Sequence, residues 1–252
     1  MICRNNRERQ GMREAGRVAA KLLRSVGERI RPGISTAELN EVTRELMGQA
    51  GAISAAYHYG SKKNPYPGYA CFSLNDVIVH GIPSRDIILR EGDILSIDLA
   101  VFYKNFCGDN TRTFRVGQVS PSADHLIQVA EEALMAGIQQ ALAGHYVNDI
   151  SAAIEAVALR GGYSIVREFV GHGIGHEMHE GPQIPNYTLS QKGVKLRPGM
   201  SLAIEPMFTL GSADIQNDPD GWTVRTRDHS LAVHVEHTIL VTENRPEILT
   251  LP

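Results

Sequence analysis

Three histidines and two glutamates crowd into the segment VGHGIGHEMHE, which runs from Val170 to Glu180. Histidine and carboxylate side chains are common metal ligands, so this composition suggests a metal site. However, HEMH is one residue short of the HExxH zinc motif, and the glycines around His172 and His176 disfavour a helix with two histidines on one face. We therefore expect one histidine to bind metal with partners from elsewhere, and another to face a substrate.

Four carboxylates occupy strand-like segments where apolar residues would be expected. They are Asp98 in ILSIDLAVF, Asp109 after KNFCG, Glu205 in SLAIEPMF and Glu236 in LAVHVEHTILV. Burying an unpaired carboxylate costs several kcal/mol, so such a group needs a cation or a shared proton. Either aspartate alone could be a structural residue that is hydrogen-bonded to a turn. Four acids in such positions, however, predict a shared cation site.

The spacing of Asp98 and Asp109 leaves two arrangements open, because their strands can be joined by either of two turns. A two-residue turn at Tyr103 and Lys104 places the aspartates directly opposite each other. A turn at Lys104 and Asn105 makes them diagonal neighbours on one face of the hairpin. In both arrangements the two carboxylates converge.

Charge counting limits the metal content of such a site. Four carboxylates carry a charge of about -4, which two divalent ions neutralise, and a neutral imidazole can complete the ligand set. Oxygen-rich ligation with a single nitrogen favours manganese, iron(II), cobalt or an open catalytic zinc site. Two ions about 3.5 to 4 Å apart can activate a hydroxide and polarise a carbonyl, which is hydrolytic chemistry.

The elements that must position these side chains belong to a duplicated unit. Leu89 to Asp98 reads LREGDILSID, and Leu196 to Glu205 reads LRPGMSLAIE, so Asp98 and Glu205 occupy equivalent positions. The tripeptide HGI precedes both copies, at His80 and at His172, and ISTAELNEV in the first half resembles ISAAIEAV in the second. Three pairs of similar segments in the same order predict pseudo-symmetric halves, about 1–118 and 119–252.

Each half is expected to run from helices to strands. Helical spacing of apolar residues covers Arg9–Val26, Thr36–Ala50, Ser122–Leu142 and Asp149–Arg160. Strand patterns cover Tyr69–Leu74, Ile94–Phe102, Cys107–Val116, Ser164–Phe169, Ser201–Phe208, Trp222–Thr226 and Leu231–Thr242. This order predicts an α+β fold with helices packed on a curved, mainly antiparallel sheet, as one catalytic domain over residues 1–252. We expect the cleft at the junction of the halves.

Composition narrows the class of protein. The 252 residues are 42% hydrophobic and 21% charged with a net charge of -3, which offers no polycationic surface for direct nucleic-acid binding. Three cysteines without a CxxC pair predict neither disulfides nor a thiolate zinc site. The first residues lack a signal-peptide core, acidic Glu8 and Glu14 are unlike a transit segment, and no run of about 18 apolar residues follows. We expect a cytoplasmic protein without a membrane span.

Together these residues resemble the type I methionine aminopeptidases, whose pita-bread fold is shared with prolidase, aminopeptidase P and creatinase. The matching segments, in the family's order between Cys71 and Thr242, are CFSLNDVIVHGIP, GDILSIDLAVF, FCGDNTRTF, GHGIGHEMHEGPQ, LRPGMSLAIEPM and GWTVRTRDHSLAVHVEHTILVT. The resemblance implies two divalent ions held by Asp98, Asp109, His172, Glu205 and Glu236. It also implies that Asp109 and Glu236 bridge the ions and that Glu205 is the general base.

The resemblance further implies a substrate site. His179 would contact the scissile carbonyl or the developing oxyanion, and His80 would assist near the leaving amide nitrogen. The methionine pocket would include Cys71, Tyr66, Met178 and Trp222, and a thioether sulfur makes favourable contacts with such ring edges. The expected reaction is release of an N-terminal methionine that precedes a small second residue. The substrates would be nascent polypeptides that leave the ribosome, and the enzyme would act on them as a monomer.

The chain departs from the family pattern at several points. The loop YHYGSKKNPYPGYAC is longer than usual before Cys71, so either Tyr57 or Tyr59 could reach the pocket. Tyr66 stands where phenylalanine is common, and His234 where glutamine is common. His176 has no expected role.

Two alternatives remain open from the sequence. An Xaa-Pro aminopeptidase or prolidase of the same fold would keep all five ligands, although such chains generally carry an additional N-terminal domain. A pita-bread binding protein without catalysis would have lost ligands, whereas all five are intact here. The short interval between Glu205 and Glu236 also lacks the helical insertion of the type II enzymes.

Overall fold

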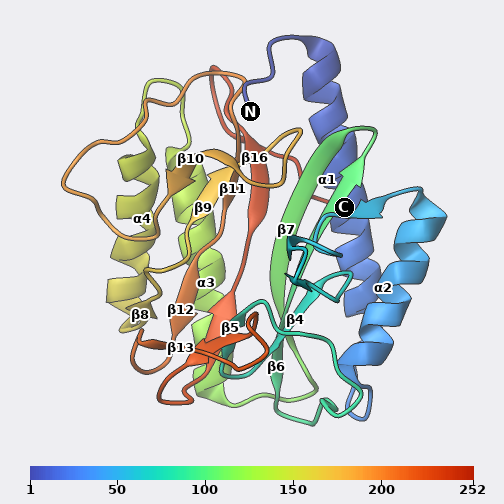
Figure 1. The fold of residues 1–252 in the computed structure, drawn as a ribbon. Coiled ribbons are helices and arrows are strands. Elements are labelled where there is room, and N and C mark those ends of the chain that lie inside the picture. Colours follow the sequence, from blue (N-terminus) through green and yellow to red (C-terminus); the bar gives the residue numbers. More distant parts are fainter.

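Four helices flank the strands of the computed structural model, which describes residues 1–252 (Figure 1). They are α1 (Asn6–Gly27), α2 (Thr36–Ala50), α3 (Pro121–Gln140) and α4 (Val147–Gly161). In Figure 1, α1 and α2 lie on one side of the strands and α3 and α4 on the other. All strand pairings are antiparallel, so the predicted α+β fold is confirmed. None of the helices could span a membrane.

Local capping explains why the helices begin where they do. Ser35 and Glu38 form a reciprocal capping box at the start of α2, and Gly51 ends it in the left-handed conformation with φ 64°. The observed bounds of α2 equal the predicted ones. Asn5 accepts a hydrogen bond from the N–H of Glu8, which starts α1 three residues before the predicted position.

The first half centres on a long hairpin made of β6 (Ile94–Tyr103) and β7 (Phe106–Arg115). Strands β1 (Ile53–Ser54) and β4 (Cys71–Leu74) pair with β6, and α1 packs on the hairpin. The turn lies at Lys104 and Asn105, whose φ angles of 48° and 69° are typical of a two-residue type I′ turn. Asp98 is therefore opposite Thr111, and the two aspartates are diagonal neighbours.

Two sheets form most of the second half. One has the order β10-β9-β11-β16-β17, and the other β15-β12-β8. The strands of the first sheet are β9 (Gly171–Gly173), β10 (Glu180–Ile184), β11 (Ser201–Ile204), β16 (His237–Leu240) and β17 (Glu247–Ile248). Those of the second are β8 (Ser164–Ile165), β12 (Met207–Thr209) and β15 (Ala232–His234). The helices α3 and α4 cover this half, and α3 contacts β11, β12 and β15.

The predicted continuous strands Ser201–Phe208 and Leu231–Thr242 are wrong in one respect, because each is interrupted at its acidic residue. Glu205 separates β11 from β12, and Glu236 separates β15 from β16. The register nevertheless continues across the gap, since Ile204 pairs with His237 and Met207 with His234, which leaves Glu205 facing Glu236. Pro206, next to Glu205, has no N–H to give to the ladder.

Shorter strands complete the chain and correct three predicted boundaries. Strands β5 (Val77–Val79), β13 (Ile215–Asn217) and β14 (Val224–Thr226) form one small sheet, and β2 (Gly60–Ser61) with β3 (Asn64–Pro65) forms a hairpin. The predicted strands at Tyr69 and Trp222 begin two residues later, at Cys71 and Val224. The predicted strand Ser164–Phe169 retains only its first two residues, as β8.

Two hydrophobic cores lie beneath the two helix pairs. The larger contains residues of α3, α4 and the second-half strands, such as Ile154 and Phe208, and the smaller contains residues of α1, α2 and β6, such as Leu39 and Leu99. Fully burying a side chain of this kind contributes about 1.5–3 kcal/mol. The four acidic residues come from both halves: Asp98 and Asp109 from the first, and Glu205 and Glu236 from the second.

Candidate active site and metal centre

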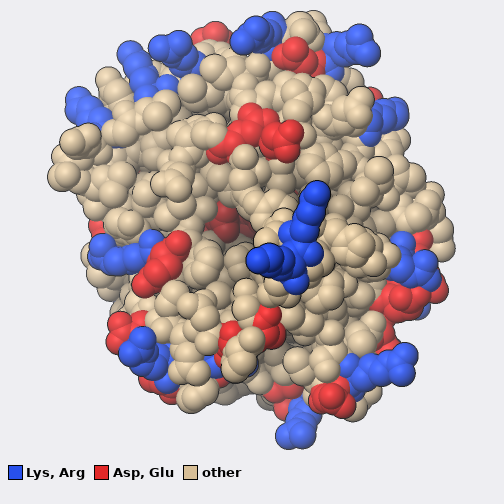
Figure 2. Space-filling model, viewed as in Figure 1, with Lys and Arg blue, Asp and Glu red and all other residues tan.

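A cavity of about 580 Å³ opens at the junction of the halves. Figure 2 shows the corresponding face, with a hollow that has acidic side chains at its base. The cavity is lined by every residue that the sequence analysis assigned to the site: Tyr66, Cys71, His80, Asp98, Asp109, His172, Met178, His179, Glu205, Trp222 and Glu236. The structure thus brings together residues that are far apart in the chain.

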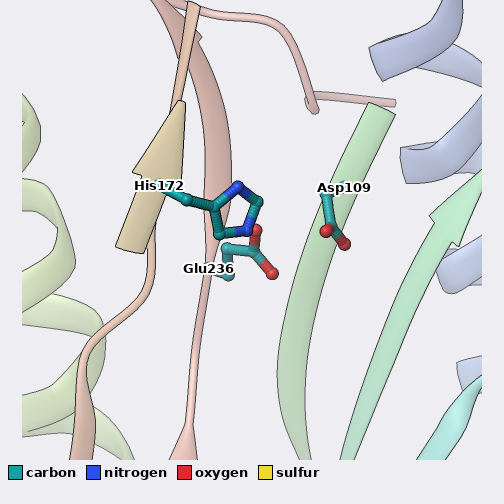
Figure 3. A group of neighbouring side chains, drawn as sticks. All are labelled: Asp109, His172 and Glu236. Atoms are coloured by element: carbon teal, nitrogen blue, oxygen red, sulfur yellow. The ribbon is translucent and has the colours of Figure 1, made fainter. Parts of the chain in front are cut away.

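Three of the expected metal ligands converge closely (Figure 3). Asp109 on β7, His172 on β9 and Glu236 between β15 and β16 each offer a ligand atom, and these atoms lie within 4.8 Å of one another. All three side chains are at least 93% buried. This geometry is compatible with a metal ion bound between the two halves.

The remaining two carboxylates lie on the same cavity wall. Oε1 of Glu205 lies 3.5 Å from Nε2 of His172, and Asp98 reaches the cavity from β6. Burial, followed by the charges of Asp98 and Glu205, raises the pKa of Asp109 well above its ordinary value. Burial and the charge of Asp109 do the same to the pKa of Glu236. The cluster of acids therefore favours binding a cation.

The polar atoms of this cluster fit a divalent cation. Oδ1 of Asp109 and Oε1 of Glu236 are buried without a hydrogen-bond partner, and buried polar atoms are rarely left so. Nδ1 of His172 lies 2.9 Å from the carbonyl oxygen of Gly173, to which it can donate. That hydrogen bond leaves Nε2 of His172 as the nitrogen with a free lone pair, the form in which imidazole binds metal.

Threonine hydroxyls join the two halves behind the acids. Thr111 on β7 donates to Oε2 of Glu236 at 2.8 Å, and Thr238 on β16 donates to the carbonyl oxygen of Asp109 at 2.7 Å. The N–H of Asp109 in turn donates to the Thr238 hydroxyl at 3.1 Å. These threonines were not predicted from the sequence. A signal existed, because DNT at Asp109 and EHT at Glu236 both place a threonine two residues after an acid.

Two further residues contact Glu205. Asn186 donates its side-chain amide to the carbonyl oxygen of Glu205 at 3.0 Å. Nε2 of His234, a residue that is only 3% exposed, lies 3.2 Å from Oε2 of Glu205, although the two atoms are not aligned for a hydrogen bond. His234, which stands where glutamine is common in the family, thus lies beside the carboxylate of Glu205.

The other histidines of the sequence motifs differ in their surroundings. His179 packs edge-on against His172, with ring centroids 4.4 Å apart, and burial lowers its pKa. His80 lies edge-on to Trp222 and has a positive φ of 59°, and burial lowers its pKa also. His176 lies outside the cavity, where its Nδ1 is 2.8 Å from the carbonyl oxygen of Asn105 in the hairpin turn.

Four aromatic and sulfur-containing side chains line the same cavity as the acids and form its apolar wall: Tyr66, Cys71, Met178 and Trp222. Tyr66 is fully buried, donates its hydroxyl to the carbonyl oxygen of Gly81 at 2.8 Å, and meets Trp222 edge-on. Cys71 pairs with Asp98 in the sheet, which joins this wall to the acidic side of the cavity. The choice between the two loop tyrosines is also decided, because Tyr59 lines the cavity and Tyr57 stacks on Tyr69 outside it.

Comparison with known proteins agrees with this geometry. Residues 10–243 match the model of metallopeptidase family M24. A methionine aminopeptidase from Clostridium acetobutylicum is 40% identical over 251 residues, covering 100% of this chain and 99% of its own. The crystal structure of methionine aminopeptidase from Rickettsia prowazekii is 38% identical, with a TM-score of 0.95 and full coverage of both chains.

A prolidase structure from Pyrococcus furiosus shares the fold alone, at 24% identity and a TM-score of 0.80, and this chain covers 66% of it. The expected pita-bread fold is thus confirmed by the methionine aminopeptidase structures. Family membership and the convergence of Asp109, His172 and Glu236 together indicate that the protein uses a divalent metal. The chain therefore belongs to metallopeptidase family M24, and within it to the methionine aminopeptidases.

Proposed function

We propose that this protein hydrolyses the first peptide bond of methionyl peptides and nascent proteins, releasing methionine that precedes a small residue. The observation that carries the proposal is one cavity that is lined by four carboxylates, an imidazole of metal-ligating type, and sulfur-containing and aromatic side chains. The full-length likeness to methionine aminopeptidases supports the same assignment.

In this proposal two divalent ions, of manganese, iron(II), cobalt or zinc, are held by the acidic side of the cavity. The proposed ligands are Asp98, Asp109, His172, Glu205 and Glu236. Bound there, the ions would acidify a water molecule and polarise the scissile carbonyl. Four carboxylates and a neutral imidazole suit two such ions in both charge and donor type.

The side chains around the ligands have distinct proposed tasks. Glu205 accepts the proton of the attacking water, since it lines the cavity. Asn186 holds its backbone carbonyl, and Nε2 of His234 lies 3.2 Å from its carboxylate. His179 donates a hydrogen bond to the carbonyl oxygen as negative charge develops on it. His80, on the side of the cavity near Trp222, assists near the leaving amide nitrogen.

The apolar wall is the proposed pocket for the methionine side chain. Cys71, Tyr66, Met178 and Trp222 line the cavity, and ring edges and sulfur atoms offer favourable contacts for a thioether. The proposed preference for a small second residue is based on the resemblance to methionine aminopeptidases. The enzyme would act as a monomer in the cytoplasm, on N-termini that emerge from the ribosome.

Methionine release from Met-Ala-Ser tests this proposal. We expect the purified protein, handled without oxygen and supplied in turn with manganese, iron(II), cobalt or zinc, to release methionine detectable by mass spectrometry. A parallel assay with Xaa-Pro peptides tests the prolidase-like alternative, which faster cleavage of those peptides would favour. Tight binding of Met-Ala-Ser without any methionine release, across all metals, would instead indicate a non-catalytic binding protein.

A further inference from the structure

We infer that Tyr59 is a positioning residue for His179: its hydroxyl donates to Nδ1 and thereby holds the Nε2–H of that ring ready for the substrate carbonyl. The inference rests on the proposed function for the role of His179. The contact between Tyr59 and His179 does not depend on that function, because it lies within the chain itself. It also gives a purpose to the long loop before Cys71, which the assignment of ligands leaves unexplained.

The geometry of the pair is that of a hydrogen bond. Oη of Tyr59 lies 2.8 Å from Nδ1 of His179, and the two rings meet at 74° with centroids 5.4 Å apart. Both side chains line the same cavity. The Tyr59 hydroxyl has no other hydrogen bond within the protein, so His179 is its single partner.

The direction of this hydrogen bond decides which proton His179 can offer. A neutral imidazole carries one N–H, and the partner at one nitrogen selects the tautomer. If Tyr59 donates to Nδ1 of the neutral ring, then Nε2 carries the proton. An Nε2–H is the group that a developing oxyanion requires.

The loop that carries Tyr59 is fixed at both of its ends. The N–H of Tyr59 donates to the carbonyl oxygen of Ala56 at 2.9 Å, and its own carbonyl accepts from the N–H of Tyr66, also at 2.9 Å. The hairpin of β2 and β3 follows this loop and packs against Trp222 of the apolar wall. A Cβ atom at Gly60 would lie 2.5 Å from the Trp222 ring, so glycine permits this close approach.

A second attachment holds the hairpin from the other strand. Asn64 donates its side-chain amide to the carbonyl oxygen of Asp220 at 3.1 Å, two residues before Trp222. The hairpin therefore joins the segment of the apolar wall to the histidine at the reaction centre. Tyr59 stands where this loop meets the segment that carries His179.

Tyr59→Phe tests the inference, because it removes the hydroxyl and keeps the ring. Tyr57→Phe is the matched control, since Tyr57 comes from the same loop, is 39% exposed compared with 44% for Tyr59, and its hydroxyl makes no hydrogen bond. For methionyl peptides we expect Tyr59→Phe to lower kcat roughly 10- to 100-fold, as loss of an outer contact to a catalytic group does. KM should change little, because the contact matters mainly in the transition state.

A spectroscopic readout separates the contact from the reaction. In the metal-free protein, ¹⁵N NMR of the His179 ring should show a protonated Nε2 and an unprotonated Nδ1, and Tyr59→Phe should shift the Nδ1 resonance or mix the tautomers. Tyr57→Phe should leave both kinetics and spectrum unchanged. An unaltered His179 spectrum in Tyr59→Phe, or a loss confined to KM, would overturn the inference. If wild-type protein releases no methionine, the proposed function fails, but the spectrum still decides the Tyr59 contact.

Discussion

Thr111 donates its hydroxyl to Oε2 of Glu236 at 2.8 Å, and the N–H of Glu236 donates to the carbonyl oxygen of Thr111 at 2.9 Å. The two residues come from different halves of the chain, 125 positions apart. This reciprocal pair fixes both the backbone and the carboxylate of Glu236 while leaving Oε1 free toward the cavity. A predicted metal ligand is thus oriented before any metal binds.

Replacing Thr111 with Val should loosen this ligand at nearly constant volume. The change leaves Oε2 of Glu236 buried without its donor, which costs about 1–3 kcal/mol of unfolding free energy. Metal affinity should fall roughly 10- to 100-fold, the usual effect of losing a hydrogen bond to a ligand. Urea unfolding and calorimetric metal titration would measure the two effects.

Thr188→Val is the matched control for this substitution. Thr188 also donates its hydroxyl to a glutamate, Glu155, but on the exposed surface. It should lose little stability and no metal affinity. Equal effects of the two valine substitutions would show that the Thr111 contact does not orient Glu236.

Glu205→Gln should nearly abolish turnover. Glutamine keeps the shape of the side chain but cannot accept a proton, and loss of a general base lowers rates by roughly 10²- to 10⁴-fold. Methionine release from Met-Ala-Ser measures the loss, while metal analysis shows whether the ions are retained. Glu155→Gln, on the surface, should leave the rate unchanged. Substantial activity in Glu205→Gln would remove this residue from the general-base role.

Stability without metal should fall as pH rises. The pKa values of Asp109 and Glu236 are raised in the folded protein, chiefly by burial and then by neighbouring acids. Below the ordinary pKa of about 4 both folded and unfolded states are protonated, so the contribution to stability is fully present there. It is lost as pH rises through the folded pKa values, because the unfolded chain then ionises more readily.

Thermal unfolding of the chelated protein between pH 5 and 8 would measure this trend, and added manganese should oppose it. His237 acts in the other direction, since burial lowers its pKa to about 4 and its contribution to stability is lost as pH falls toward that value. Glu236→Gln removes one buried acid and should flatten the decline. Identical pH dependence of stability in the metal-free wild type and in Glu236→Gln would contradict the expectation.

Gly60→Ala should raise KM for methionyl peptides. The residue has a φ of 93°, and the added Cβ would meet the Trp222 ring at 2.5 Å, so the ring or the hairpin must move away from the apolar wall. Gly51→Ala is the control, because Gly51 also has a positive φ, 64°, but its Cβ would meet nothing within 4 Å. Both variants should lose about 1–2 kcal/mol of stability from backbone strain. Equal KM values for the two variants would show that Trp222 does not form part of the methionine pocket.

Local signals made part of the fold predictable from the sequence. The bounds of α2 follow from Ser35, Glu38 and Gly51, three residues that act within one turn of the helix ends. The hairpin register was narrowed to two alternatives, because either turn satisfied the spacing of the aspartates. The choice depended on the left-handed conformations of Lys104 and Asn105, which no periodicity reveals.

Contacts distant in sequence decided the features that were missed. Strand β9 consists of Gly171, His172 and Gly173, a composition that favours a loop. A Cβ at Gly173 would lie 2.0 Å from the carbonyl oxygen of Gly181, so these glycines serve the close approach of neighbouring strands. The breaks at Glu205 and Glu236 were missed for a related reason, since their alternation with apolar residues is typical of continuous strands.

Neither half of the chain can assemble the proposed metal centre alone. The first half supplies Asp98 and Asp109 from β6 and β7, and the second supplies His172, Glu205 and Glu236. Glu236 directly precedes β16, so a chain whose synthesis has stopped before this point lacks a ligand that no earlier segment replaces. Incompletely synthesised copies would therefore lack the complete proposed ligand set and the hydrolysis that depends on it.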